Sequence, residues 1–257
     1  MNFMLFVVLL GGAVASFVPY GGGMYNLGLK YCSISTLENI KKQMPCGFPE
    51  YNLPPLAPFK EERIEFNIDE KIGNASGELN NLRVDGLNDF DIDDIQFSVL
   101  TLKITFNINF NKISALSQYI LKVTRPIILN SNGDLDFKLT DLRLKGTIKL
   151  GAKLSGVQIK DFNIVVTLGG AESNISGIVD DEKLNEFINR IIEKTVVDTV
   201  KDQQTVISKQ IHDIVVPQAN KILSQYTLGD IISMISKPSK PSTCVPPPDN
   251  DLSYILY

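Results

Sequence analysis

The chain has 257 residues, of which 44% are hydrophobic and 21% charged, and its net charge at pH 7 is -4. This length and apolar content suffice for one domain with a large core or for two smaller domains. The acidic balance argues against a nucleic-acid partner and against electrostatic docking on acidic lipid surfaces, because both partners attract a basic excess that the chain lacks.

The first residues predict export. Phe3 to Leu10 form an unbroken apolar run, and Ala13-Val14-Ala15 supplies the small residues that a signal peptidase requires. An N-terminal membrane anchor is the alternative, but the run is too short to span a bilayer. We therefore predict a signal peptide over residues 1–15 and a secreted, extracellular protein without an integral membrane span. Triplets beginning at Asn74 and Asn174 are acceptors for N-glycosylation, which fits this route.

A short helix and a stiff connector are expected next. Residues 16–31 include three consecutive glycines and are expected to be flexible. The capping box Ser35-Thr36-Leu37-Glu38 predicts where the helix begins, and Pro45 should end it. The following segment, Cys46 to Phe59, contains four prolines and predicts a stiff connector between this helix and the strands.

After the connector the hydrophobic period changes to 2, which is typical of β-strands. The clearest strand is Leu100 to Phe110, with apolar and polar residues on opposite faces. The alternation changes phase between Leu139 and Leu142 and again between Ile159 and Phe162. Each change predicts a β-bulge, which bends a strand. Bent strands in series predict a sheet that curls around another element.

A long helix is the predicted element inside the curl. From Asp181 the period returns to 3.6 and continues to Tyr226, about 45 residues or on the order of 70 Å. Aspartates at the start suit a helix N-terminus, and Pro217 should kink or interrupt the helix. Wrapping in a curved sheet would bury its apolar side. A coiled coil is the alternative, but the "KDQQT" segment breaks its seam. Residues 237–257 are rich in proline and serine and predict a disordered C-terminal segment.

Little in the sequence favours catalysis or metal binding. His212 is the only histidine, so no histidine pair is present for a metal or a proton relay. Asp89, Asp91, Asp93 and Asp94 crowd one segment and could supply oxygens to calcium, but charges on an exposed strand edge give the same pattern. We favour the strand edge and predict a protein that is not an enzyme and has no metal and no cofactor.

Five segments carry a resemblance to a known family, and they occur in the order "GFPEYNLPPLAPF", "NLRVDGLNDFDI", "NGDLDFKLTDLRLKGTIKL", "LNEFIN" and "ANKILSQYTLGDII". Together they resemble the insect takeout and haemolymph juvenile-hormone-binding protein family. The resemblance implies one ligand-binding domain over residues 32–236 with an α+β fold. In that fold a long α-helix is wrapped by a strongly curved antiparallel β-sheet that encloses an elongated apolar tunnel.

The resemblance also implies a function. Such a protein would carry a small hydrophobic ligand, such as juvenile hormone, a fatty acid or a similar terpenoid or lipid, in haemolymph or another extracellular fluid. A protein receptor is left open. The residues expected to line the tunnel are apolar and lie on one face of the strands or of the long helix: Leu102, Ile104, Phe106, Ile108, Phe137, Leu144, Ile148, Phe162, Ile164, Ile188, Ile191 and Ile192.

Periodicity cannot distinguish a tunnel from a solid core, so a second reading stays open. In that reading the protein has the same fold with a filled interior. It would be a secreted interaction protein that acts on lipid aggregates, microbial surfaces or a protein partner.

The family resemblance also guides the cysteine assignment. Cys32 matches the second of two neighbouring family cysteines, whose upstream partner is missing here. We therefore predict a disulfide between Cys32 and Cys46 that closes a loop around the short helix. A bridge to Cys244 stays open.

Overall fold

The computed structural model describes residues 27–49, 53–70, 73–125, 128–153, 156–236 and 242–245. The predicted signal peptide and most of the predicted C-terminal segment lie outside these residues. The elements in chain order are α2 (Leu27–Gln43), η1 (Met44–Cys46), β1 (Phe59–Glu70), β2 (Gly73–Asp85), β3 (Phe90–Ser98), β4 (Lys103–Arg125), β5 (Leu129–Lys153), β6 (Gly156–Ile175), α3 (Glu182–Asp202), α4 (Gln204–Leu223) and α5 (Leu228–Ser236).

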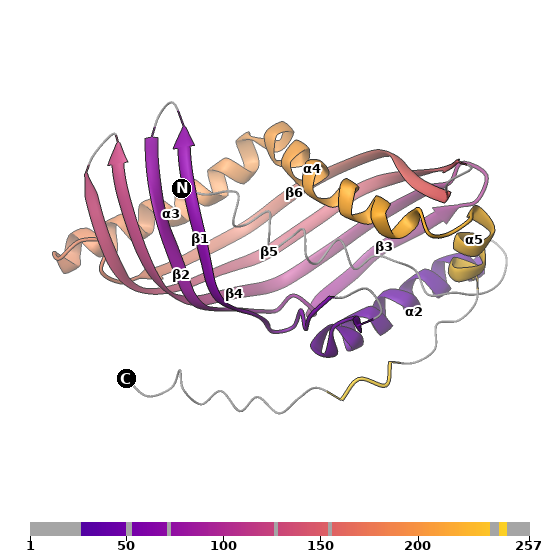
Figure 1. Ribbon diagram of the computed structural model, residues 1–257, viewed down its shortest axis with the longest axis horizontal. Helices are drawn as coiled ribbons and strands as arrows, with labels where there is room; N and C mark the ends of the chain where they lie inside the picture. Colours follow the sequence, from indigo (N-terminus) through magenta and orange to yellow (C-terminus); the bar gives the residue numbers. More distant parts are fainter. Residues whose placement is uncertain are drawn as a thin grey trace.

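The six strands form one antiparallel sheet in the order β1-β2-β4-β5-β6, and β3 pairs with β4 off this path. β4 spans 23 residues, so it can pair with β3 through its first half and with β2 through its second half. The sheet curves strongly, and α3 and α4 run along it (Figure 1). β1 and β6 do not pair with each other, so the sheet is not closed. The predicted α+β class with a curved antiparallel sheet is confirmed.

One of the two predicted bulges is confirmed. Lys149 of β5 pairs with Asp161 of β6, but the next residue, Leu150, pairs with Ile159. Lys160 is therefore the extra residue on β6, and an extra residue on one strand bends and twists the pair.

The other phase change has a different cause. Between Leu139 and Leu142 the register of β5 with its neighbours does not shift, but Asp141 adopts a φ of 50°. This left-handed conformation, rare outside glycine, leaves both leucines buried although they are three residues apart. Their partners on β4, Ile113 and Phe110, are buried as well. The prediction of a bulge here is wrong. β4 and β5 instead share a bend without an extra residue, called the crease below, and residues on both sides of it lie on the buried face.

The long helix is interrupted at a different place from the one expected. Asp181 caps it as predicted, since its carboxylate accepts a hydrogen bond from the Leu184 amide at 2.8 Å. The break falls at Gln203, between α3 and α4, whereas Pro217 lies inside α4. Both helices pack on β6, and the break allows them to follow that curved strand. No described helix has the length and apolarity that a membrane span needs.

The first helix starts earlier than the capping box indicated. α2 begins at Leu27, so residues 27–31, which were expected to be flexible, are helical and the capping box lies inside the helix. One glycine and no proline occur between Leu27 and Ser35, so no residue there ends a helix. Pro45 lies in η1, directly after α2, as predicted.

The disulfide joins Cys46 to Cys244, with their Cα atoms 5.8 Å apart. The predicted Cys32–Cys46 pairing is wrong. Cys32 lies in α2, eleven positions before Gln43, and at 1.5 Å per residue this places it about 17 Å from the end of the helix. A disulfide tolerates at most about 7 Å between Cα atoms.

The disulfide also anchors part of the C-terminal segment that was expected to be disordered. Residues 242–245 lie against the end of α2 and η1, and the Ser242 hydroxyl donates to Oε1 of Gln43 at 2.9 Å. The expectation of disorder is therefore wrong for these four residues.

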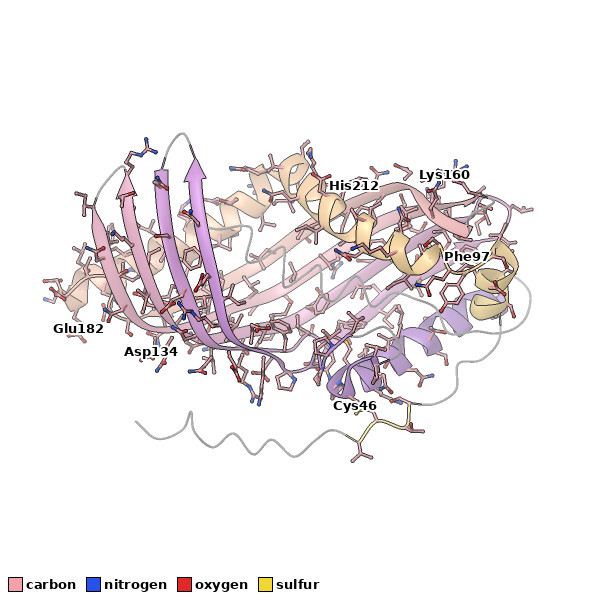
Figure 2. The ribbon with its side chains drawn as sticks, viewed as in Figure 1. Cys46, Phe97, Asp134, Lys160, Glu182 and His212 are labelled. Atoms are coloured by element: carbon pink, nitrogen blue, oxygen red, sulfur yellow. A yellow bond between two sulfur atoms is a disulfide. The ribbon has the colours of Figure 1, made fainter. Side chains whose placement is uncertain are left out.

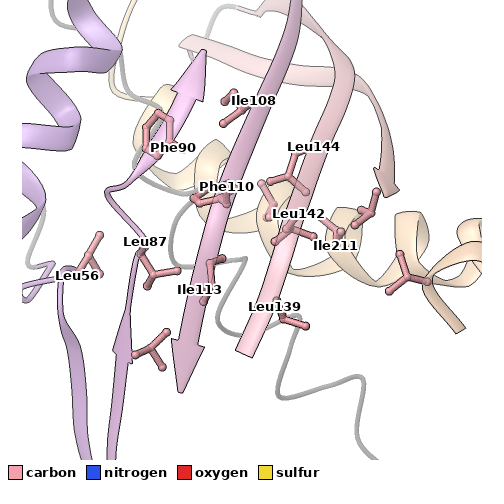
Figure 3. Close-up of a cluster of buried hydrophobic side chains, with 14 of the residues drawn as sticks. Leu56, Leu87, Phe90, Ile108, Phe110, Ile113, Leu139, Leu142, Leu144 and Ile211 are labelled. Carbon is pink, nitrogen blue, oxygen red and sulfur yellow. The ribbon is translucent and has the colours of Figure 1, made fainter. Parts of the chain in front are cut away.

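Buried side chains form two apolar clusters. The larger cluster joins the inner face of the sheet to α3, α4 and the proline-rich connector, which contributes Leu56. Figure 3 shows part of it, where Phe110 and Leu142 of the crease lie near Ile211 of α4. The smaller cluster lies where β5 and β6 meet α5 and includes Phe97 and Ile231.

Candidate ligand-binding site

Most of the strand residues predicted to line a tunnel fall in three neighbouring rows on one face of β4, β5 and β6. By register these rows are Ile104–Ile148–Phe162, Phe106–Gly146–Ile164 and Ile108–Leu144–Val166. The alternation in the sequence therefore placed these side chains correctly relative to one another. That they line a tunnel stays a prediction.

The part of the inner face beside α4 is filled by protein side chains. Ile108 and Leu144 are each only 2% exposed, and the α4 residues Ile207 and Ile211 are 1% exposed in the same cluster. At the far end, Leu102, Ile104 and Ile148 pack against the smaller cluster. Ile108 and Leu144 are therefore closely packed, whereas Leu102, Ile104 and Ile148 are only partly buried.

The half beside α3 contains a group of partly buried apolar side chains. Here the inner-face side chains of β1, β4 and β5, and one on α3, contact the core but are only partly buried: Phe66, Leu121, Leu135, Phe137 and Ile188. The sequence analysis selected Phe137 and Ile188 and missed the other three. The period-2 alternation of the sequence identifies these three residues, because each occupies the inward phase of its strand, as Phe66 does in "RIEFNID".

The apolar face of α3 is wider than its contact with the sheet. Ile192 is 8% exposed and packs in the core, but Leu184, Phe187 and Ile191 share another face and are 47%, 53% and 48% exposed. Ile188 lies between the two faces by helical spacing. Ile191 is therefore not part of the buried core, and its place in the lining of a ligand site stays a prediction. Nearly half of its surface, like that of its two neighbours, remains open to contact.

Two asparagines on α3 fix this helix to the edge of the sheet. Asn189 accepts from the Ile175 amide at 2.9 Å, donates to the Ile175 carbonyl at 2.9 Å and accepts from the Ser173 hydroxyl at 2.6 Å. Asn185, one turn earlier, donates to the same carbonyl at 2.8 Å and accepts from the Ile178 amide at 3.0 Å. Asn189 is 7% exposed, so it forms these bonds inside the protein.

Three further side chains continue this pattern along β6. Oε1 of Glu193 accepts from the Ser173 amide at 2.9 Å. Gln204 bonds both the amide and the carbonyl of Val166, and Asn220 accepts from the Ile159 amide at 2.7 Å. β6 is the last strand of the sheet, so these side chains pair backbone groups that an edge strand leaves without a strand partner. The sequence analysis missed them because polar side chains on a helix usually face solvent.

Two hydroxyls lie together on the inner face of the α3 half. The Tyr119 hydroxyl donates to the Ser176 carbonyl at 2.8 Å, and Tyr119 is 7% exposed. Burial raises the pKa of Tyr119, and the neighbouring Ser131 hydroxyl offsets part of that rise. Ser131 is 5% exposed, and its hydroxyl makes no hydrogen bond of 3.5 Å or less within the described structure. These are buried polar groups among apolar neighbours.

The opposite face of the same strands carries a shallow depression of about 500 Å³. Five of its eight lining residues are polar or charged, namely Glu65, Asn67, Ser76, Glu78 and Lys122. The other three are Ile120 and the inner-face residues Phe66 and Gly77. Charged walls of this kind do not suit an apolar ligand, because binding would strip water from the charges without replacing their hydrogen bonds.

The other polar residues considered above have ordinary surroundings. His212 is half exposed on α4 beside Asp213 (Figure 2). Asp91 accepts from Asn111 at 2.8 Å, and Asp93 pairs with Arg143 at 3.5 Å. Across the described ranges, no three His, Cys, Asp or Glu side chains come together as a metal site.

The glycosylation acceptors lie on two different strands. Asn174 is exposed on β6, and Asn74 is half-buried near the start of β2. Modification of either residue stays a prediction.

The model of the haemolymph juvenile hormone binding protein (JHBP) family matches residues 22–233. The chain belongs to this family. Among solved structures, Takeout 1 of Epiphyas postvittana is similar, with a TM-score of 0.54 and 9% identity over 77% of this chain and 93% of that one. This likeness concerns the fold alone.

A lipopolysaccharide-binding protein structure matches the JHBP-family chain more weakly. Its TM-score is 0.40 and its identity 15%, over 77% of this chain and 40% of that one. A score this low adds nothing to the assignment of fold. A comparison with curated proteins gives no match.

Proposed function

We propose that the protein is a secreted carrier that holds one small hydrophobic ligand against the inner face of the sheet beside α3. The observation that supports this most is the contrast between the two halves of the inner face. Ile108 and Leu144 beside α4 are fully buried, whereas Phe137 and Leu121 beside α3 are only partly covered. Membership of a family named for juvenile hormone binding supports the same function.

Affinity would come mainly from burial of the ligand. Each methylene removed from water contributes about 0.8 kcal/mol, so ten methylenes supply about 8 kcal/mol before the costs of association. The open sheet would let a ligand enter from the side. The exposed apolar face of α3, with Phe187 at its centre, would cover the ligand from the helix side. A carrier of this kind changes no bond in its ligand and needs no catalytic group.

Secretion is part of the proposal. The apolar run over Phe3 to Leu10 fits a signal peptide, and the Cys46–Cys244 disulfide fits an oxidising compartment. The second candidate, an interaction protein with a filled interior, is favoured by the closed α4 half alone. It would leave the partly covered side chains beside α3 without a role.

Native mass spectrometry of the protein mixed with C16 lipids tests the proposal. We expect a one-to-one complex, and we expect Ile188→Arg to abolish it because the charge would lie in the site. Val165→Arg is the matched control, since Val165 is 52% exposed on the outer face of β6 and its replacement should leave binding intact. Absence of any lipid complex with the unaltered protein would defeat the proposed function.

A further inference from the structure

Ser131 is a buried hydroxyl that makes no hydrogen bond of 3.5 Å or less within the described structure, although its interaction with the Tyr119 hydroxyl offsets part of the rise that burial causes in the pKa of that tyrosine. It is 5% exposed on the inner face of β5, and its oxygen makes no hydrogen bond of ordinary length there. Ser117 on the same face is a useful contrast. It is 7% exposed, but its hydroxyl donates to the Asn80 carbonyl at 2.9 Å. Burying a hydroxyl without a partner costs free energy, so such a group in a native protein calls for an explanation.

Ser131 lies at the end of the partly covered apolar surface. By register, Phe66 of β1, Gly77 of β2, Leu121 of β4 and Ser131 form one row across the sheet. The Phe66 ring lies over Gly77, where an added Cβ would come within 2.7 Å of a ring carbon. The row therefore runs from a phenyl ring, across a leucine, to a hydroxyl.

The adjacent row brings a second hydroxyl to the same place. Tyr119 occupies the next inward position on β4 and pairs with Gly133, two residues from Ser131. The Tyr119 hydroxyl gives its proton to the Ser176 carbonyl, so its oxygen can still accept. Ser131 can donate one hydrogen bond and accept others. Together the two residues offer one donor and several acceptor positions.

We propose that Ser131 and Tyr119 form the polar end of the ligand site and bind a neutral hydroxyl or carbonyl group at one end of an otherwise apolar ligand. This inference rests on the proposed carrier function and specifies the ligand class. A hydroxyl group on the ligand would bond to both residues, because it can accept a hydrogen bond from Ser131 and donate one to Tyr119. A carbonyl uses the Ser131 donor alone.

The same surroundings disfavour an ionised carboxylate. The inner-face positions that adjoin Ser131 by register are Leu121, Val123 and Gly133, and none carries a charge. A buried carboxylate needs a cation or several donors, and this end of the site offers one hydroxyl proton. Fatty alcohols and esters therefore fit the site better than fatty acids at neutral pH.

Binding of 1-hexadecanol, methyl hexadecanoate and hexadecanoate at pH 7.4 tests this inference. We expect the unaltered protein to bind the alcohol and the ester at least tenfold more tightly than the carboxylate. Ser131→Ala should weaken alcohol binding by about fivefold to tenfold, the usual effect of one hydrogen bond. Tyr119→Phe should weaken binding of the alcohol but not binding of the ester. Ser117→Ala is the matched control and should change neither, because its hydroxyl is already bonded to protein.

The outcomes separate this inference from the function on which it rests. If hexadecanoate binds as tightly as the alcohol, or if Ser131→Ala has no effect on the alcohol, the polar end is assigned wrongly and the carrier function stands. A water bound to Ser131 would give that second result. If none of the three lipids binds to the unaltered protein, the carrier function fails as well.

Discussion

The ring of Phe106 on β4 lies across Gly146 on β5, so that a Cβ added to the glycine would come within 2.8 Å of a ring carbon. The same Cβ would come within 2.3 Å of the Asn163 carbonyl oxygen on β6. A residue without a side chain is therefore required at the middle of this row, because the aromatic ring and the neighbouring strand occupy the space.

Gly146→Ala should destabilise the protein. The new methyl must displace the Asn163 backbone or the Phe106 ring, and overpacking of this kind costs about 1–3 kcal/mol. Urea unfolding followed by circular dichroism measures the loss. Gly229→Ala in α5 is the control, because its nearest atom would lie at an ordinary 3.6 Å. Equal stability of the two variants would contradict the packing described for this row.

Asn189→Leu should destabilise the protein by more than a surface substitution. The change removes four hydrogen bonds and leaves the Ile175 amide without its partner in a buried place, at a cost of about 2–4 kcal/mol. Asn163→Ala, on the outer face of β6, should cost less than about 0.5 kcal/mol. Thermal or urea unfolding of both variants checks the difference. An Asn189→Leu variant with unchanged stability would show that the polar contacts of α3 do not hold the helix.

Loss of the Cys46–Cys244 disulfide should lower stability, whereas replacement of Cys32 should leave the bridge in place. The two bridged cysteines are separated by 198 residues, and the chain-entropy model gives up to about 5 kcal/mol for a loop of that size. Cys244→Ser is the variant and Cys32→Ser the control. Peptide mapping under non-reducing conditions should recover Cys46 linked to Cys244, and a peptide linking Cys32 to Cys46 would contradict the structure.

The hydrogen bonds at the start of α5 should make a small contribution to the stability of the protein, and this contribution should be lost at acid pH. Hydrogen bonds from the Thr227 hydroxyl and amide, at 2.7 and 2.8 Å, lower the pKa of Asp230. A lowered pKa means that the contribution is present above the unfolded-state pKa and is lost as pH falls through the folded-state pKa. An NMR titration of the Asp230 carboxyl should therefore give a midpoint below the ordinary aspartate value. Thr227→Ala should move that midpoint back up.

Much of the fold follows from hydrophobic period. The alternation from Ile104 to Phe110 predicted which face of β4 is buried, although the strand begins at Lys103 and Leu100, predicted to belong to it, is 98% exposed in the preceding turn. The phase change near Lys160 identified a real bulge. The shared crease at Asp141 was not predictable, because a left-handed residue and a bulge change the phase of a sequence in the same way.

Other features depend on contacts between distant segments. The break at Gln203 falls inside the KDQQT segment, where the apolar period is interrupted, but the sequence analysis placed the interruption of the helix at Pro217. The amides of Asn185 and Asn189 bond to β6, and on a helix such residues usually face water. The partner of Cys46 comes from the far end of the chain, and periodicity could not tell that the α4 half is filled while Phe137 is left partly covered.

The most direct test of the account uses the absence of tryptophan from the sequence, which allows a single fluorescent reporter to be introduced. Phe137→Trp places the reporter in the α3 half, and Phe162→Trp places it in the filled half, where Phe162 is 5% exposed. Addition of 1-hexadecanol should shift the emission of the Phe137→Trp variant to shorter wavelength, because the ligand replaces water at the indole ring. The emission of the Phe162→Trp variant should stay unchanged. A shift in the Phe162→Trp variant alone, or in neither variant when both are folded, would contradict a ligand site beside α3.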